Sequence, residues 1–149
     1  MDLKYMDLAF LEAEKAFKLG EVPIGAVIVK DGKILAKSHN VKEKSMCSVN
    51  HAEILAILKA SKKLKNWRLD DCDIYVTLEP CPMCASAIKQ SRIKNVYSAL
   101  ENKDKNNKFI ISKIFESDMV NPSVNFVNNL SAEKSETLLQ NFFSLRRKK

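Results

Sequence analysis

The sequence predicts an α/β fold built on a mixed β-sheet, and three features support this prediction. Segments with apolar residues at helical spacing alternate along the chain with short apolar segments rich in β-branched residues. The pair Asp31-Gly32 separates two of the extended segments, as is typical of a β-hairpin. A helix lies between later extended segments, which favours parallel pairing in part of the sheet. The chain has 149 residues, a usual size for one domain, so we expect a single domain over residues 1–149.

Periodicity and turn signals place the individual elements. Gly20 is suited to the position just past the end of the first helix. Asn50 is a candidate N-cap for the second helix, and Pro82 suits the first turn of the third. Helices are expected at residues 6–17, after residue 50, from residue 82, at 109–115 and from residue 131. Strands are expected at residues 24–30, 33–38, 73–78, 93–99 and 123–127, and surface loops at 41–49 and 102–108.

The composition excludes several classes of protein. With 46% hydrophobic and 29% charged residues, the chain is typical of a soluble globular protein, not of a disordered, collagen-like or coiled-coil protein. Its longest apolar stretch, at residues 22–29, is far shorter than the roughly 20 residues of a membrane-spanning helix. The amino terminus lacks the basic start, apolar core and cleavage site of a signal peptide. We therefore expect no membrane association and a cytoplasmic location.

Positive charge is concentrated in two places along the chain. The net charge is +7, and residues 146–149 supply four basic side chains. A second basic cluster lies at residues 59–68. This distribution suits a polyanionic partner such as nucleic acid. The alternative is a solvated helix face with a solubilising tail, and charge alone does not separate the two.

Two short motifs contain residue types that bind metals. His51 and Glu53 open the second predicted helix, and Cys81 and Cys84 lie at the start of the third. Cysteines at i and i+3 in a first helical turn lie on one face, and a helix amino terminus favours the thiolate that binds metal. In a reducing cytosol, such cysteines favour metal or redox chemistry over disulfides. Two thiolates and one imidazole would leave the fourth position of a zinc ion open, as in catalytic zinc sites.

Other interpretations of these residues remain open at this point. Cys81 and Cys84 could form a redox pair. Glu53 could belong to a capping box with Asn50, although that motif normally begins with Ser or Thr. His51 and Glu53 are two residues apart, roughly 200° around an ideal helix, so their spacing does not show that both reach one metal. A structural zinc site would need a fourth ligand, for which the candidates are Cys47, Cys72 and His39.

The pattern His-x-Glu followed by Pro-Cys-x-x-Cys resembles the signature of the zinc-dependent nucleobase deaminases. Within that family, the bacterial tRNA-specific adenosine deaminases are similar in three further stretches: EVPIGAV at residues 21–27, YVTLEPC at 75–81 and SRI at 91–93. They are also similar in the pair FF at 142–143, followed by RR at 146–147. The resemblance covers essentially the whole chain. It implies a three-layer α/β/α sandwich of the cytidine deaminase type, with a mixed central sheet of about five strands flanked by helices.

The resemblance also implies roles for individual residues. His51, Cys81 and Cys84 would hold one Zn²⁺ per subunit, and Glu53 would transfer protons without binding the metal. Zinc would lower the pKa of its bound water toward about 7, and the resulting hydroxide would attack the adenine carbon that carries the amino group. The residues that would bind the substrate are Asn40, Val22, Leu78, Glu101, Phe142, Phe143, Arg146 and Arg147.

The implied function is conversion of the wobble adenosine of tRNA to inosine by a homodimer that binds the anticodon stem-loop. Asn40 would hydrogen-bond the target nucleotide, and Val22 and Leu78 would line the base pocket. The anticodon loop would be held by stacking and phosphate contacts from Phe142, Phe143, Arg146 and Arg147. We expect at least one of the two phenylalanines in this segment to lie in the hydrophobic core instead.

The chain departs from the family pattern in one loop. Residues 100–108 contain no glycine, and Glu101 stands where the family usually has an aspartate. Two other functions remain as alternatives: a deaminase of a free base or nucleoside such as cytosine, cytidine or guanine, and a nucleic-acid-binding module with structural zinc and no activity. The basic carboxy-terminal helix argues against the first alternative, and Glu53 argues against the second, because a structural zinc site has no use for that carboxylate.

Overall fold

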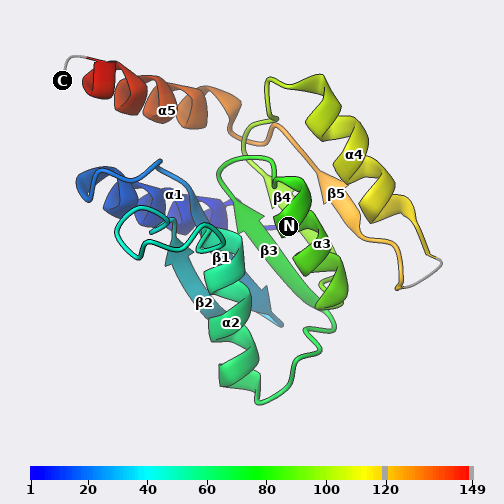
Figure 1. Ribbon diagram of the computed structural model, residues 1–149. Helices are drawn as coiled ribbons and strands as arrows, with labels where there is room; N and C mark the ends of the chain where they lie inside the picture. The colour runs from blue at the N-terminus through cyan, green and yellow to red at the C-terminus, as the bar shows by residue number, and fades with distance from the viewer. Residues whose placement is uncertain (119–120, 148–149) are drawn as a thin grey trace.

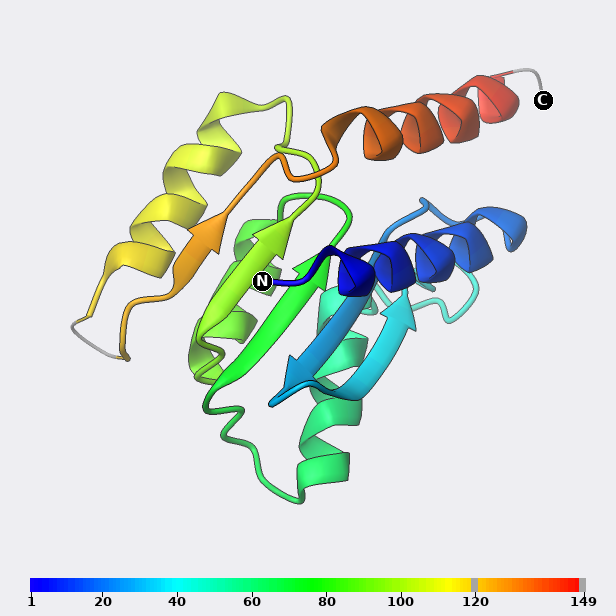
Figure 2. The ribbon, with the colours of Figure 1, turned by 180° about the vertical axis from the view of Figure 1, so that it is seen from behind.

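The computed structural model describes residues 1–118 and 121–147. In this part of the chain, five strands form one sheet and five helices cover its two faces (Figure 1 and Figure 2). The helices are α1 (Leu3–Lys18), α2 (Ala52–Leu64), α3 (Pro82–Gln90), α4 (Lys105–Glu116) and α5 (Ala132–Arg147). The strands are β1 (Gly25–Lys30), β2 (Lys33–His39), β3 (Cys72–Val76), β4 (Asn95–Ser98) and β5 (Asn125–Val127).

The sheet is mixed, as the sequence predicts. Its strand order is β2-β1-β3-β4-β5. Strand β1 pairs antiparallel with both β2 and β3, whereas β4 pairs parallel with both β3 and β5. The β1–β2 hairpin turns at Asp31 and Gly32, whose φ angles of +50° and +74° suit a type I′ turn. Helix α3 joins β3 to β4 and α4 joins β4 to β5, so the carboxyl ends of the three parallel strands lie at one edge of the sheet.

Two cores, one on each face of the sheet, give the three layers expected from the family resemblance. Helix α1 packs on one face, where Tyr75 and Tyr97 lie with ring centroids 4.9 Å apart, and Leu138 of α5 packs against the same cluster. On the other face, Ile74 and Val96 lie in a core that includes buried residues of α2, α3 and α4. Figure 1 and Figure 2 show α2 and α3 on one side of the sheet and α1 on the opposite side.

The predicted cap of the second helix is wrong. His51, not Asn50, is the N-cap residue of α2, and its side chain makes no capping hydrogen bond. The Asn50 side chain instead donates to Ser45 Oγ at 2.9 Å, within the preceding loop. Because Asn50 does not cap the helix, the capping-box interpretation of Glu53 is also wrong.

The predicted surface loop at residues 102–108 is also wrong in its second half. Helix α4 begins at Lys105, and Asp104 caps it by accepting the backbone N–H of Asn106 at 2.9 Å. Asn107 is buried, and Ile111 of the same helix lies in the core, so tertiary packing stabilises a helix whose first turn has low helix propensity. Strand β4 is shorter than the predicted segment at 93–99.

Among the helices that the structure describes, none is both long and apolar enough to cross a membrane.

Candidate metal centre and substrate pocket

The candidate metal centre lies where the first turns of α2 and α3 meet. His51 is the N-cap of α2, and Cys81 is the N-cap of α3. Pro82 occupies the first turn of α3, where its missing N–H costs nothing, and Cys84 lies in the same turn. Cys84 is fully buried, whereas His51 and Cys81 are half-buried. The three side chains come from two segments that are far apart in the sequence.

The geometry of these three side chains suits a metal ion. Their ligand atoms all lie within 4.8 Å of one another. His51 Nδ1 lies 3.5 Å from Cys84 Sγ and 3.8 Å from Cys81 Sγ. For tetrahedral zinc, with Zn–N of about 2.0 Å and Zn–S of about 2.3 Å, the nitrogen and sulfur ligands are about 3.5 Å apart. The described residues therefore form a three-ligand set of the right size and chemistry.

The electrostatics of the centre also favour a cation. A hydrogen bond from the Cys84 thiol lowers the pKa of Cys81 to about 5, against the opposing effect of burial. The same hydrogen bond raises the pKa of Cys84, and burial raises it further. One thiol therefore keeps its proton while the other is a thiolate. A metal ion that replaced this proton would stabilise both sulfurs as thiolates.

Glu53 lies next to this three-ligand set. The residue is buried, and its carboxyl group lies close enough to the Cys84 thiol for each group to shift the pKa of the other. Burial is the main reason why the pKa of Glu53 is raised, to about 7, and the nearby Cys81 adds to the effect. A carboxyl group with such a pKa can both accept and donate a proton near neutral pH. His51 lies outside the helix as its cap, so the ideal-helix angle between residues 51 and 53 does not keep the two side chains apart.

The candidate fourth ligands do not join this group in the described part of the chain. Cys72 is fully buried in the core, and burial raises the pKa of its thiol to about 11. His39 Nδ1 instead lies 3.3 Å from Glu12 Oε1. Cys47 belongs to the loop after β2 and is not among the three grouped side chains. The group has three ligands, which argues against a closed structural zinc site.

A pocket of about 450 Å³ contains five of the eight predicted substrate-binding residues. These are Val22, Leu78, Glu101, Phe143 and Arg147. The first three come from loops at the edge of the sheet, and the last two come from α5. Segments that are distant in the sequence therefore line the same pocket. The three possible metal ligands are not among the described residues that line this pocket.

The other three predicted substrate residues lie elsewhere. Asn40 Nδ2 donates to Val22 O at 3.3 Å, and Asn40 Oδ1 accepts the N–H of Lys42 at 3.1 Å. Phe142 is buried with its ring edge-on to Phe17 of α1, at 5.9 Å between centroids. Arg146 lies over the Phe142 ring, 5.4 Å from its centroid. The expectation that at least one of the two phenylalanines lies in the core is confirmed for Phe142.

A larger hollow of about 680 Å³ adjoins the pocket and shares part of its wall. Four lysines line it, Lys103, Lys105, Lys108 and Lys113, together with three glutamates, Glu101, Glu116 and Glu136. Phe109 also lines it and is exposed, so a flat apolar ring lies among the positive charges. Single-stranded nucleic acid is bound by such combinations of cations and aromatic rings. This surface could not be predicted from the sequence, because residues 102–108 resemble an ordinary polar loop.

Sequence reasoning also missed residues that shape the pocket. Glu136, Leu139 and Gln140 line it from α5, and Asn102 and Lys103 line it from the loop after β4. Their helical spacing places the first three on one face of α5, but spacing alone does not say what that face covers. Only the packing of α5 above the sheet edge makes them part of the wall.

Comparisons with known proteins agree with this site. The sequence model of the MafB19-like deaminase family matches residues 1–147. A tRNA-specific adenosine deaminase of Bacillus subtilis (strain 168) is 42% identical over 149 residues, which cover 99% of this chain and 92% of that protein. A solved structure from work on A-to-I editing by tRNA:A34 deaminases at the wobble position is 34% identical, with a TM-score of 0.84, over 93% of this chain and 100% of that one.

A guanine deaminase of Bacillus subtilis is also 34% identical, over 99% of this chain and 95% of that chain, but its TM-score is 0.67. At equal sequence identity, the fold described above therefore superposes better on the structure from the tRNA:A34 deaminase work. The family match over residues 1–147, the identity with the Bacillus enzyme and the geometry of the centre lead to one conclusion: this chain belongs to the MafB19-like deaminase family, together with tRNA-specific adenosine deaminases.

Proposed function

We propose that this protein is a tRNA adenosine deaminase that converts the adenosine at the first anticodon position to inosine and releases ammonia. The convergence of Glu53 with His51, Cys81 and Cys84 carries the chemical part of this proposal. The identity of 42% with a tRNA-specific adenosine deaminase over nearly the full length of both chains supports the choice of substrate. We also propose that residues 1–149 form a single deaminase domain.

In this proposal, His51, Cys81 and Cys84 hold one Zn²⁺. Nitrogen and sulfur ligands together favour zinc over magnesium or calcium. Bound zinc supplies a Lewis acid that makes water more acidic at neutral pH. Substitution of a ligand should therefore remove the metal and the activity together.

Glu53 moves the protons of the reaction. Its carboxylate accepts a proton from the attacking water, and the oxygen of that water forms a bond to the adenine carbon that carries the amino group. The carboxyl group then donates the proton to the departing nitrogen, so one water is consumed and one ammonia is released. The raised pKa of Glu53 supports both steps, because a group near neutrality transfers protons efficiently in either direction.

The pocket beside α5 would receive the RNA. Val22 and Leu78 provide apolar walls for a base, and Phe143 and Arg147 provide a ring and a cation from α5. Glu101 would accept a hydrogen bond from a ribose hydroxyl. Asn40 keeps one amide hydrogen beyond its bond to Val22, and this hydrogen would serve the target nucleotide. Phe142 and Arg146 would support the helix from the side of α1.

The substrate that we propose is an anticodon stem-loop, because bases in a loop are weakly stacked and are extruded at lower cost than bases in a duplex. We also propose that the protein is a homodimer in the cytoplasm. Sedimentation as a monomer at micromolar concentration would contradict the dimer.

The test is inosine formation on an anticodon stem-loop with adenosine at the wobble position. Free adenosine, cytidine, cytosine and guanine are offered as competing substrates. Inosine in the stem-loop alone is the expected result. Deamination of a free base or nucleoside, with the stem-loop unchanged, would transfer the function to a small-molecule deaminase. If the protein binds zinc and RNA but turns over none of these substrates, its function is that of a nucleic-acid-binding module without enzyme activity.

A further inference from the structure

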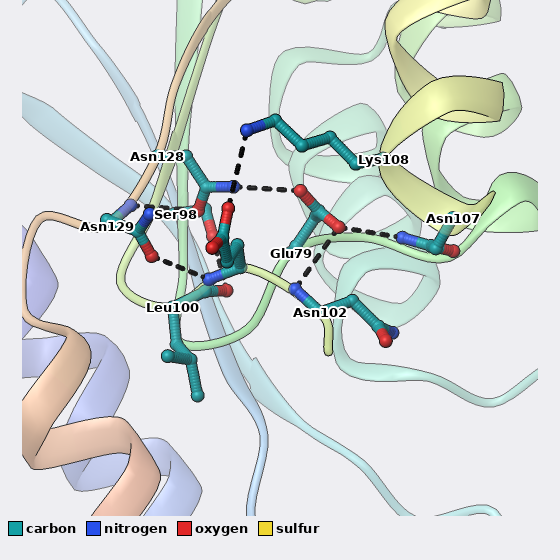
Figure 3. A network of polar contacts seen from close by, with 9 residues as sticks. Glu79, Ser98, Leu100, Asn102, Asn107, Lys108, Asn128 and Asn129 are labelled. Carbon is teal, nitrogen blue, oxygen red and sulfur yellow. Dashed lines mark hydrogen bonds and ion pairs between the residues drawn. The ribbon is translucent and has the colours of Figure 1, made fainter. Parts of the chain in front are cut away.

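Glu79 is a buried carboxylate between β3 and the cysteine motif, and only 2% of its surface is exposed. Its two oxygens accept three hydrogen bonds, all from neutral N–H groups (Figure 3). Oε1 accepts from Asn128 Nδ2 at 2.8 Å. Oε2 accepts from Asn107 Nδ2 at 2.9 Å and from the backbone N–H of Asn102 at 3.2 Å. Among the described residues, no ion pair involves Glu79.

The three donors belong to three different segments. Asn102 lies in the loop after β4, Asn107 lies in the first turn of α4, and Asn128 follows β5. Asn107 Nδ2 also donates to the carbonyl oxygen of Pro80 at 3.2 Å. One carboxylate therefore joins these segments to the short stretch of chain that leads into Cys81.

Backbone contacts continue this connection through the loop after β4. The backbone N–H of Glu79 donates to Leu100 O at 2.7 Å, and Ser98 Oγ donates to the same oxygen at 3.1 Å. The N–H of Glu101 donates to Asn129 Oδ1 at 2.9 Å. Backbone groups of the consecutive residues 100, 101 and 102 are thus hydrogen-bonded to Glu79 or to the segment that follows β5. The same three residues line the substrate pocket.

We propose that Glu79 is a positioning residue that holds the 100–102 wall of the pocket at a fixed place relative to the Cys81–Cys84 turn. This inference rests on the proposed function of the site. Glu79 touches neither the substrate nor the possible metal ligands in this role; it acts through the loop. A buried carboxylate with three hydrogen-bond donors favours one arrangement of the segments that supply them. If one donor moves away, part of the buried negative charge loses its hydrogen bond, which is costly.

The first test is Glu79→Gln, which keeps the shape of the side chain. Glutamine offers one acceptor oxygen and one NH₂ group, so one of the three donors now faces another donor. Asn128 cannot simply turn its amide, because Asn128 Oδ1 already accepts the N–H of Asn129 at 2.8 Å. We expect KM for the anticodon stem-loop to rise about tenfold, with kcat within about twofold and zinc content unchanged. An unchanged KM, or a loss confined to kcat, would overturn the inference.

The second test is the reciprocal swap, Glu79→Gln with Asn128→Asp. Aspartate at 128 can accept from the glutamine NH₂ with one oxygen and from the N–H of Asn129 with the other, and the total charge is conserved. We expect the swap to return KM to within about threefold of the original value. If the double variant is no better than Glu79→Gln alone, the donor and acceptor pairing does not position the loop.

The third test needs no substrate, so it separates this inference from the proposed function. Hydrogen exchange of residues 100–104 should become at least about tenfold faster in Glu79→Gln, while peptides that cover His51 and Cys84 stay protected. The matched control is Glu21→Gln. Glu21 is another buried carboxylate, and it accepts the backbone N–H groups of Glu43 and Lys44 at 2.9 and 2.7 Å.

Loss of the Glu21 carboxylate should speed exchange near residues 43–44 and leave 100–104 protected. Equal exchange of residues 100–104 in both variants would overturn the inference. The two proposals can also fail separately. If residues 100–104 exchange faster in Glu79→Gln alone but the protein deaminates no stem-loop, the positioning role of Glu79 is supported and the proposed substrate is contradicted.

Discussion

At the scale of single residues, Glu53 stands out among the buried carboxyl groups because burial raises its pKa and the hydrogen bonds that it receives do not offset this effect. Glu12, which is equally buried, lies 2.5 Å from Lys15 Nζ, and Glu79 accepts three N–H groups. The Glu53 carboxyl instead lies beside the Cys84 thiol, and its pKa is raised to about 7. A carboxyl group in such surroundings is costly for folding, and the cost is typical of a group that handles protons in a reaction.

Glu53→Gln should therefore lower kcat on the stem-loop by about 10²- to 10⁴-fold, because glutamine cannot accept or return a proton. Zinc content and stem-loop affinity should remain close to those of the original protein. The matched control is Glu12→Gln, which changes a buried glutamate on α1 outside the site and should leave kcat within about twofold. Turnover by Glu53→Gln at the original rate would remove Glu53 from the mechanism.

The four cysteines should separate into two classes by metal content. Cys84→Ser removes one of the three grouped ligand atoms, so zinc should fall from about one per chain to less than about 0.1 after dialysis against a chelator. Cys47→Ser changes a cysteine outside the group and should keep its zinc. Metal analysis of the two purified variants makes the comparison. Equal zinc in both would show that Cys84 is not a ligand.

At the scale of elements, the sequence predicts helices and strands correctly where residues close in the chain determine the local structure. It fails to predict them where contacts between distant segments determine it. Asp31-Gly32 predicts the β1–β2 hairpin because few other residue pairs tolerate two positive φ angles. Pro82 predicts the start of α3 for an equally local reason. The first turn of α4 was missed, because Asn107 is stabilised there by its bonds to Glu79 and Pro80. No neighbour in the sequence signals these contacts.

The candidate site likewise has one part that local sequence motifs predict and one part that depends on packing. The motifs around His51 and Cys81 predict a metal-binding group from residue type and spacing, and the structure brings their ligand atoms within 4.8 Å. The pocket could be assembled from the sequence only through family resemblance. Three of its walls come from loops, and the fourth, α5, is placed by Phe142 against Phe17 and by a hydrogen bond from Ser135 Oγ to Thr77 O at 2.5 Å.

The two adjacent phenylalanines of α5 should respond differently to truncation. Phe142 is 3% exposed and packs on α1, so Phe142→Ala should destabilise the protein by about 3 kcal/mol and lower its Tm by roughly 10 °C. Phe143 is 45% exposed and lines the pocket, so Phe143→Ala should leave Tm within about 2 °C and weaken stem-loop binding about tenfold or more. Thermal denaturation and a binding titration of both variants distinguish the two roles. Similar losses of Tm would place both rings in the core.

The contact between α1 and β1 depends on a residue without a side chain. A Cβ atom at Gly25 would lie 1.9 Å from Ala9 O and 2.7 Å from the backbone N of Ala13, so the helix would have to move. We expect Gly25→Ala to lower the free energy of unfolding by about 3 kcal/mol.

The matched control is Gly32→Ala, where no atom lies within 4 Å of the added carbon and only the positive φ of +74° is unfavourable. That variant should lose only about 1 kcal/mol. Urea denaturation of both measures the difference. Equal losses would mean that the helix moves away from Gly25 at little cost.

At the scale of the whole molecule, the structure gives the two basic clusters different roles. In the cluster at residues 59–68, Lys59 Nζ donates to Lys37 O at 2.9 Å and Lys63 Nζ donates to Ile34 O at 3.2 Å. Both oxygens belong to β2, the edge strand of the sheet, so these lysines cover an edge that would otherwise be open to other strands. Arg68 of the same cluster pairs with Asp70. In the second cluster, at the carboxyl end of the chain, Arg147 lines the pocket that we assign to RNA. Residues 148–149 of this cluster lie outside the described residues.

This division predicts how the affinity for RNA depends on salt. A cation that contacts a phosphate of a single strand contributes about 0.7 to the slope of log K against log salt concentration. Arg147→Gln should therefore reduce the slope for the anticodon stem-loop by about 0.7, because its side chain lies at the pocket. Lys63→Gln removes the same charge from the molecule but from the far edge of the sheet, so it should leave the slope unchanged. Titrations at several salt concentrations compare the two variants with the original protein. If both variants reduce the slope equally, the RNA responds to the net charge of +7 and not to a defined contact with α5.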